Sequence, residues 1–253
     1  MTMLNVEVRG QVAVLEMNRP PANFFDHDIL HAITTAISEL AADGCRAVVL
    51  AAAGKHFCAG ANFGEGAMGD ERVASSSRLY RQAVRLFRAE IPVVAAVQGR
   101  AVGGGLGLAC AADFRVASPG SRFLANFAAL GFHQGFGLSV SLPQIVGHQR
   151  AAELLYTARR VTGAEAHAIG LVDRLAEDGD IRAAALAFAE EIAAQAPLAV
   201  ASIRETLRGP LAEQVESVRE RELAEQARLW RTGDSAEGIA ASLERRAPVF
   251  RGR

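Results

Sequence analysis

The sequence has little of several features that mark particular classes of protein. Its 253 residues include only three cysteines, a number that excludes a disulfide-stapled scaffold and favours a reducing compartment. Its 27 basic and 28 acidic residues leave a net charge of −1, so it lacks the basic face of a nucleic-acid-binding protein and the polybasic patch of a membrane-bound one. Half of the residues are hydrophobic, which excludes a disordered chain.

Long apolar runs are also lacking. No stretch approaches the roughly 20 apolar residues that cross a bilayer. The first ten residues carry Glu7 and Arg9 among valines, which is not the pattern of a signal peptide. His56 and Cys58 have no second ligand pair at zinc spacing, so no metal site is expected. We therefore expect a soluble, cytoplasmic protein built as one large domain, with no nucleic-acid or membrane partner.

What the sequence does contain is an alternation of short apolar strands and amphipathic helices. Alternating residues over 5–8 and 11–17 predict a β-hairpin, and apolar runs at 47–52, 92–97 and 114–117 predict buried strands. Helical spacing predicts helices between these strands, over 26–44, over 71–89 and in the apolar segment that ends at residue 112. Buried strands separated by helices indicate an α/β fold with both faces of the sheet covered.

From Leu138 onward the chain is expected to be mostly helical, apart from a short extended piece at 171–175. Gly209-Pro210 and Gly233 are expected to break this part into separate helices. Residues 211–230 are heavily charged with a narrow apolar stripe, which suits a solvated face or a helix lying on another subunit. We divide the chain into a core, residues 1–195, and a C-terminal helical region for oligomerisation, residues 196–253.

Two glycine-rich loops follow two of the predicted strands, at 56–62 and 99–105. Glycine lets bare backbone approach a ligand, and the second loop leads into a helix whose first N–H groups have no partner within the helix. Two such loops at neighbouring strand ends can aim two N–H donors at one point, as an oxyanion hole does. An equal alternative is that the glycines only allow tight turns or close packing.

The residues of these loops form specific motifs. They read Lys-His-Phe-Cys-Ala-Gly-Ala-Asn at 55–62 and Ile-Pro-Val-Val-Ala-Ala-Val-Gln-Gly-Arg-Ala-Val-Gly-Gly-Gly at 91–105. With Asn18-Arg19-Pro20, the stretches 109–115 and 164–173 and the closing 244–250, they resemble the crotonase (enoyl-CoA hydratase/isomerase) superfamily over nearly the whole chain.

The resemblance implies an α/β fold, a spiral of strand-strand-helix repeats with a helical C-terminal region. It implies a homotrimer or hexamer, an acyl-CoA thioester as substrate, and no cofactor beyond the coenzyme A of that substrate. By motif position, the oxyanion donors are the N–H groups of Ala61 and Gly104. Lys55 stands where a cation can lie near the CoA phosphates, although a solvated loop lysine is equally expected there. The other substrate contacts implied by these motifs are Phe57, Ala59 and Gly103.

The sequence departs from the family at the residues that move protons. A hydratase of this family uses two glutamates, and their positions hold Gly107 and Phe127. Neither can take a proton, so ordinary hydration is the activity least expected. The 4-chlorobenzoyl-CoA dehalogenase branch is similar at the triple glycine and at aromatic Phe127. Its aspartate and histidine positions, however, hold Gly135 and Tyr80.

His133 is the residue we expect to serve as the acid–base group, because histidine titrates near neutral pH and lies on the loop that lines the acyl pocket in the family. The alternative is a hydrogen-bonded structural histidine. Gln134 is expected to orient water or substrate, and Phe127 to shape an apolar acyl cavity. Tyr80 and Glu65 are weaker candidates. Asp113 is expected to be an ion-pair partner rather than a catalyst.

Two functions follow from these residues. The first is a crotonase-family lyase, isomerase or hydrolase that acts on an acyl-CoA with a non-standard acid–base group. The second is a catalytically silent acyl-CoA-binding protein, a carrier, sensor or subunit partner that uses the oxyanion donors only to hold a carbonyl.

Overall fold

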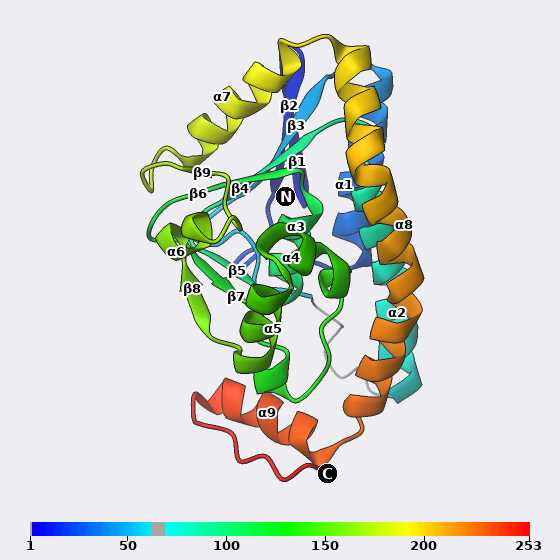
Figure 1. Ribbon diagram of the computed structural model, residues 1–253, viewed down its shortest axis with the longest axis vertical. Helices are drawn as coiled ribbons and strands as arrows, with labels where there is room; N and C mark the ends of the chain where they lie inside the picture. Colours follow the sequence, from blue (N-terminus) through cyan, green and yellow to red (C-terminus); the bar gives the residue numbers. More distant parts are fainter. Residues whose placement is uncertain (1, 62–68) are drawn as a thin grey trace.

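A computed structural model describes residues 2–61 and 69–253 and centres on a six-stranded sheet (Figure 1). The strand order is β1-β2-β3-β4-β6-β9, and all neighbours are parallel except the β1–β2 hairpin. The bounds are β1 (Leu4–Arg9), β2 (Val12–Met17), β3 (Ala47–Ala52), β4 (Val93–Val97), β6 (Phe114–Ala117) and β9 (Arg174–Leu175). The predicted hairpin and the three predicted buried strands are confirmed.

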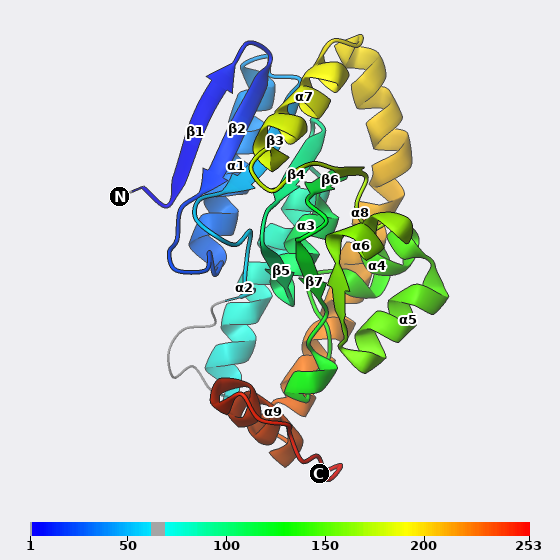
Figure 2. The same ribbon diagram turned by 90° about the vertical axis from the view of Figure 1, so that its left-hand side faces the viewer.

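A second, smaller sheet lies beside the first and was not predicted (Figure 2). Its strands, in the order β5-β7-β8, are β5 (Arg100–Val102), β7 (Arg122–Leu124) and β8 (Arg160–Thr162). Strands of three residues carry no measurable alternation, and the sequence analysis assigned 100–102 to a loop. These strands complete the expected repeat, because β4–β5–α3 and β6–β7–α4 each run strand, strand, helix.

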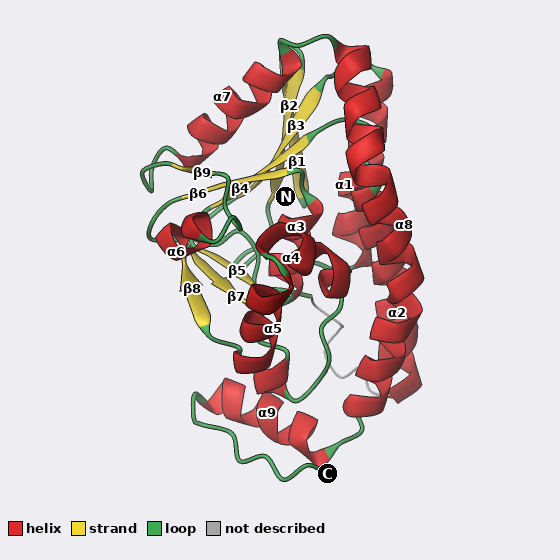
Figure 3. Cartoon of the chain, in the orientation of Figure 1, coloured by secondary structure: helices red, strands yellow, loops and turns green. Residues whose placement is uncertain are grey.

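The helices cover both faces of the large sheet (Figure 3). Successive strand residues point to opposite faces. Thus Val12 and Val14 pack toward α7, while Ala13 and Leu15 pack into the larger core with α1. The α/β prediction is therefore confirmed. The helices are α1 (His27–Ala42), α2 (Gly69–Phe87), α3 (Gly104–Ala111), α4 (Leu138–Val146), α5 (His148–Thr157), α6 (Gly163–Ala168), α7 (Ile181–Ala193), α8 (Pro197–Leu229) and α9 (Gly233–Glu244), with a 3₁₀ turn at Ala128–Leu130.

The expected break at Gly209-Pro210 is wrong, because α8 runs unbroken for 33 residues. A proline inside a helix removes one hydrogen bond and costs about 3 kcal/mol in isolation. Here the helix is held on both sides of Pro210. Arg204 and Arg208 are anchored before it, and Leu211 and Val215 are buried after it. Tertiary packing therefore overrides the local signal.

Asp113 joins α8 to the sheet. Its carboxylate pairs with Arg204 at 3.1 Å and with Arg208 at 3.2 Å, and it also accepts the N–H of Val93 at 2.8 Å. The carboxylate is only 8% exposed, so it compensates two buried guanidinium groups. This confirms the expected structural role of Asp113.

All three cysteines are buried and unpaired. Burial raises the pKa of Cys58 to about 12 and that of Cys110 to about 11, so both thiols are neutral at physiological pH. Among the residues described, no single helix is long and apolar enough to cross a bilayer. Helices α7 and α8, which meet at 106°, pass the same test of length and composition as a pair.

Replacing Asp113 by alanine should lower the free energy of unfolding by about 3–5 kcal/mol, because it leaves two buried cations without their carboxylate. Urea denaturation followed by circular dichroism measures the change. Asp178→Ala, at an exposed position, is the matched control and should change stability by less than about 0.5 kcal/mol. An equally small effect of Asp113→Ala would contradict the anchoring role.

Candidate active site

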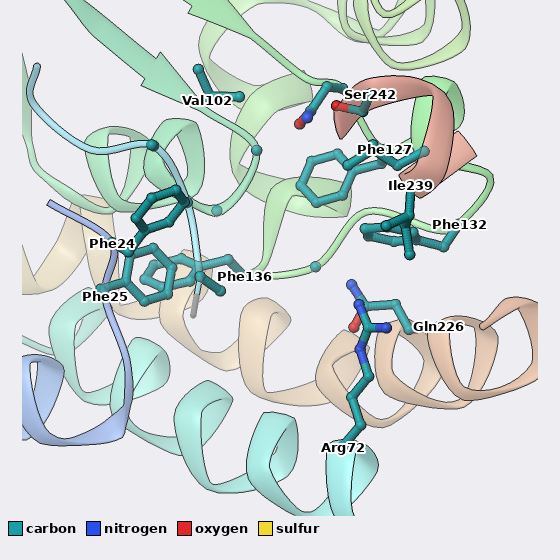
Figure 4. Close-up of a pocket in the computed structure, with 18 of the residues that line it drawn as sticks. Phe24, Phe25, Arg72, Val102, Phe127, Phe132, Phe136, Gln226, Ile239 and Ser242 are labelled. Atoms are coloured by element: carbon teal, nitrogen blue, oxygen red, sulfur yellow. The ribbon is translucent and has the colours of Figure 1, made fainter. Parts of the chain in front are cut away.

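A cavity of about 470 Å³ lies where the two glycine-rich loops meet α2, α8 and α9 (Figure 4). This volume is in the range of small-molecule sites. In Figure 4, Phe24, Phe25 and Phe136 gather at one side, while Phe127, Phe132 and Ile239 lie at the other. The described lining is Phe24, Phe25, Ala59, Gly60, Ala61, Arg72, Tyr80, Val102, Gly103, Gly104, Asn126, Phe127, Leu130, Phe132, Gly135, Phe136, Gln226, Ile239, Ser242 and Leu243.

The two loops lie against each other, backbone to backbone. The N–H of Val102 donates to the carbonyl of Cys58 at 3.0 Å. A Cβ on Gly105 would lie 2.2 Å from that same carbonyl oxygen, so only glycine permits this approach. Gly103 has φ +55°, a positive value that favours glycine, at the turn that leads into α3. Close packing and a tight turn therefore both apply, and they position the amides that follow.

The amides of Ala61 and Gly104 lie on one wall of the cavity. A Cβ built on Gly104 would be 3.5 Å from the Ala61 nitrogen, and one built on Gly60 would be 3.8 Å from the Gly104 nitrogen. Gly104 is the first residue of α3, where an N–H has no acceptor within the helix. Neither amide donates to a backbone carbonyl within the described ranges. The two amide nitrogens therefore lie close together on one wall of the cavity.

Helices α2 and α8 form the polar side of the cavity. Arg72 and Tyr80 are eight residues apart and share a face of α2, and Gln226 faces them from α8. The Tyr80 hydroxyl donates to Oε1 of Gln226 at 2.7 Å. The guanidinium of Arg72 lies 4.2 Å from the centre of the Trp230 ring.

Aromatic rings brace the remaining walls. Phe25 and Phe136 meet edge to face at 5.2 Å, and Phe132 meets Phe127 and Trp230 at 6.0 Å each. Such contacts hold the rings in fixed orientations. The cavity therefore has a rigid, mostly apolar interior suited to a hydrocarbon chain.

The structure brings some of the predicted site residues to the cavity and leaves others away from it. Ala59, Ala61, Gly103, Gly104 and Phe127 line it. The four predicted residues that are outside the described lining are Lys55, Phe57, His133 and Gln134. Whether any of these residues binds substrate stays a prediction.

These four residues have other surroundings. Lys55 is exposed, and Phe57 is fully buried in the core. The side-chain amide of Gln134 donates to the Ser139 hydroxyl at 3.0 Å. Glu65 lies outside the described residues.

The contacts of His133 are those of the alternative given above, a hydrogen-bonded structural histidine. Its Nδ1 lies 2.7 Å from the carbonyl oxygen of Gln134, which can only accept, so Nδ1 carries a proton. Its own carbonyl accepts from Nε2 of Gln226 at 3.0 Å. These bonds tie the His133 loop together and to α8.

Two positions named in the sequence analysis have no room for a side chain. A Cβ on Gly107 would lie 2.7 Å from Cβ of Phe136, and one on Gly135 would lie 2.2 Å from the Tyr80 hydroxyl. Phe136 and Tyr80 thus occupy the space that larger residues at 107 and 135 would need. Arg72 and Gln226 were missed as cavity residues, and Tyr80, named only as a weaker catalytic candidate, lines the cavity as well. The only signal in the sequence that could have placed Arg72 and Tyr80 together is their spacing of eight residues within one predicted helix.

Glu222 fixes the loop that ends at α4. Its carboxylate accepts the N–H of Gly137 at 2.9 Å and that of Ser139 at 3.0 Å, and the residue is 1% exposed. Burial raises the pKa of this carboxyl above its ordinary value, although the two amides act in the opposite direction. Glu222 is therefore a buried anchor rather than a cavity residue.

The fold is α/β, and the amide nitrogens of Ala61 and Gly104 lie close together at the cavity. A sequence model of the enoyl-CoA hydratase/isomerase family matches residues 7–253. The chain belongs to this family, which confirms the resemblance of its glycine-rich loops. Membership also supports the expected substrate class, an acyl-CoA thioester.

Comparisons with individual relatives support the same family. A Thermus thermophilus protein, provisionally named an enoyl-CoA hydratase, is 38% identical over 98% of this chain and 100% of its own length. The cyclohexa-1,5-dienecarbonyl-CoA hydratase of Thauera aromatica is 33% identical over 98% of this chain and 96% of its own. A crystal structure of an enoyl-CoA hydratase/isomerase from Pseudoalteromonas atlantica has a TM-score of 0.86 at 31% identity, covering 99% of this chain and 100% of that one.

Replacing Glu222 by glutamine should lower the free energy of unfolding by about 1–3 kcal/mol, because one of the two buried N–H groups loses its acceptor. The raised pKa means that the folded state binds more protons than the unfolded state, so the wild type gains stability as the pH falls. The loss should therefore be larger at pH 5 than at pH 7 in urea denaturation. Glu220→Gln, at an 85% exposed carboxylate, is the control and should show neither effect.

Proposed function

We propose that this protein converts an acyl-CoA thioester through an enolate whose oxygen accepts hydrogen bonds from the N–H groups of Ala61 and Gly104. The observation that carries this proposal is the placement of both amides on one wall of an apolar cavity. Charge develops on the thioester carbonyl as the enolate forms, and each such donor contributes about 3–4 kcal/mol in comparable sites. No cofactor beyond the coenzyme A of the substrate is needed for this step.

Addition of water is the reaction that the cavity supports least. The two positions where a hydratase of this family carries glutamate hold Gly107 and Phe127, and Phe136 fills the space beside Gly107. The described residues that line the cavity include no carboxylate. A lyase reaction, which forms the enolate without an activated water molecule, is therefore favoured over hydration.

Tyr80 is the group best placed to move a proton. It lines the cavity, and burial, with a smaller effect of Glu222, raises the pKa of its hydroxyl. The phenol therefore stays protonated at neutral pH and can donate a proton but not accept one. This suits a lyase reaction in which a C–C bond to Cα breaks, the electron pair stays on Cα as the enolate, and the other carbon leaves as CO₂ or as a neutral carbonyl compound. The Tyr80 hydroxyl then protonates Cα, and the phenolate takes its proton back from water. His133 is not needed in this scheme.

Assembly as a homotrimer or hexamer is part of the same proposal. The first half of α8 exposes Leu198, Ile203 and Leu207, which are 86%, 59% and 71% exposed in the single chain. Contact with neighbouring subunits would bury these side chains. Residues 196–253 would then serve both the assembly and the cavity, since Gln226 and Ile239 line the latter.

Replacing Gly104 by alanine should lower kcat/KM for an acyl-CoA at least about 100-fold, because the added methyl group enters the space between the two amides. A panel of acyl-CoA thioesters assayed by chromatography of the products measures this. Gly179→Ala, where a Cβ meets nothing within 4 Å, is the matched control and should keep full activity.

The same methyl group would also touch the ring of Phe25, 2.7 Å away. The double variant Gly104→Ala/Phe25→Leu removes that contact and should remain inactive. Recovery of activity in the double variant would contradict the oxyanion role. Tight binding of acyl-CoA by the wild type, with no turnover of any thioester, would instead favour the alternative of a catalytically silent acyl-CoA-binding protein.

Replacing Tyr80 by phenylalanine should lower kcat at least about 100-fold and leave the dissociation constant of the acyl-CoA within a few-fold, because only the donated proton is lost. His133→Ala should keep the wild-type kcat. Stopped-flow turnover and isothermal titration calorimetry measure both quantities. Wild-type turnover by Tyr80→Phe, or loss of turnover in His133→Ala, would show that the proton donor has been assigned to the wrong residue.

A further inference from the structure

Arg72 gives one side of the cavity a positive charge. It is the only charged side chain among the described residues of the lining, most of which are aliphatic, aromatic or glycine. Figure 4 shows its side chain running from α2 into the cavity, near Gln226 of α8. The cavity therefore presents a cation on the wall that α2 forms.

The guanidinium is held in place by aromatic rings. Its central carbon lies 4.2 Å from the Trp230 ring centre and 5.9 Å from that of Phe132. Cation–π contacts of this kind orient the planar group and become stronger as water is excluded. Burial lowers the pKa of Arg72, yet an arginine keeps its charge at any physiological pH.

Arg72 and the oxyanion amides face one cavity from different sides. Gly104 and Ala61 lie beside Phe25, since a Cβ on Gly104 would touch that ring. Arg72 lies beside Phe132, which Figure 4 shows on the opposite side from Phe25. A ligand whose thioester carbonyl occupies the amides can therefore extend along the apolar walls toward Arg72.

We infer that Arg72 is a specificity-determining residue that selects acyl-CoA thioesters whose acyl chain ends in a carboxylate. A planar guanidinium pairs with a carboxylate through two parallel hydrogen bonds, and in an apolar cavity such a pair discriminates strongly against a methyl end group. The substrate class is then the mono-CoA thioesters of dicarboxylic acids. This inference rests on the proposed function, because it needs the thioester to occupy the oxyanion amides.

The test compares acyl chains of equal length with and without the terminal carboxylate. Dissociation constants are measured by isothermal titration calorimetry with succinyl-, glutaryl- and adipyl-CoA against butyryl-, pentanoyl- and hexanoyl-CoA. For at least one pair, the wild type should bind the carboxylate ligand at least about tenfold more tightly. Arg72→Met should remove that preference, and Arg72→Lys should keep part of it.

Arg81→Met is the matched control, since Arg81 lies on the same helix with an exposed side chain and contacts only Ser77 among the described partners. It should preserve the preference, which separates the local effect of Arg72 from loss of one positive charge on the protein. Circular dichroism and thermal unfolding show whether each variant is folded.

The outcomes separate the two proposals. If the wild type binds no acyl-CoA of either kind, the proposed function fails. If it binds both kinds equally, the function stands and the inference about Arg72 is overturned by the wild type alone, whatever the variants do. If folded Arg72→Met weakens both kinds of ligand equally, Arg72 only shapes the cavity and the inference is again overturned.

Discussion

The contact between the two glycine-rich loops is the constraint on which the rest of the site depends. The Val102 amide binds the Cys58 carbonyl, and Gly105 leaves room for that carbonyl where any side chain would collide with it. This approach sets Ala61 and Gly104 beside each other at the start of α3. A larger distance between the loops would separate the amides. The cavity would then keep its apolar walls but could not bind the thioester carbonyl in the way proposed above.

Helix α8 supplies the opposite side of the same cavity. Asp113 fixes its first half to the sheet. Its second half carries Glu222 and Gln226, and Trp230, four residues further on, caps its C-terminus. Each of these three has a different partner: the N–H groups at the start of α4, the Tyr80 hydroxyl and the Arg72 guanidinium. One helix therefore links the core, the loop that carries His133 and the polar wall.

The large sheet could be predicted from the sequence because its strands are buried on both faces. Residues 47–52 were predicted as a buried strand from their apolar run, and the observed strand has the same bounds. Strands such as β7, with Arg122 at one end and only three residues, leave no comparable pattern. The proline signal at 210 failed for another reason, since burial of Leu211 and Val215 outweighs the missing hydrogen bond.

The candidate site could be predicted only where a motif lies within one stretch of chain. Ala61 and Gly104 follow from loop motifs, and both line the cavity. The polar wall joins residues 72 and 80 to residue 226, and no local pattern records that α2 and α8 lie together. His133 was expected at the acyl pocket because its loop passes there. Its ring instead hydrogen-bonds to the Gln134 carbonyl and is outside the described lining, and sequence alone does not specify the direction of a side chain.

The double anchoring of α8 has a consequence for how this chain can change. Arg208 is held at Asp113 and Gln226 at Tyr80, so the number of residues between them is set by two fixed points on one rigid rod. Adding or deleting a single residue there would turn everything beyond it by about 100° around the axis and point Gln226 and Trp230 away from the cavity. This stretch can exchange its exposed side chains freely, but it cannot alter its length.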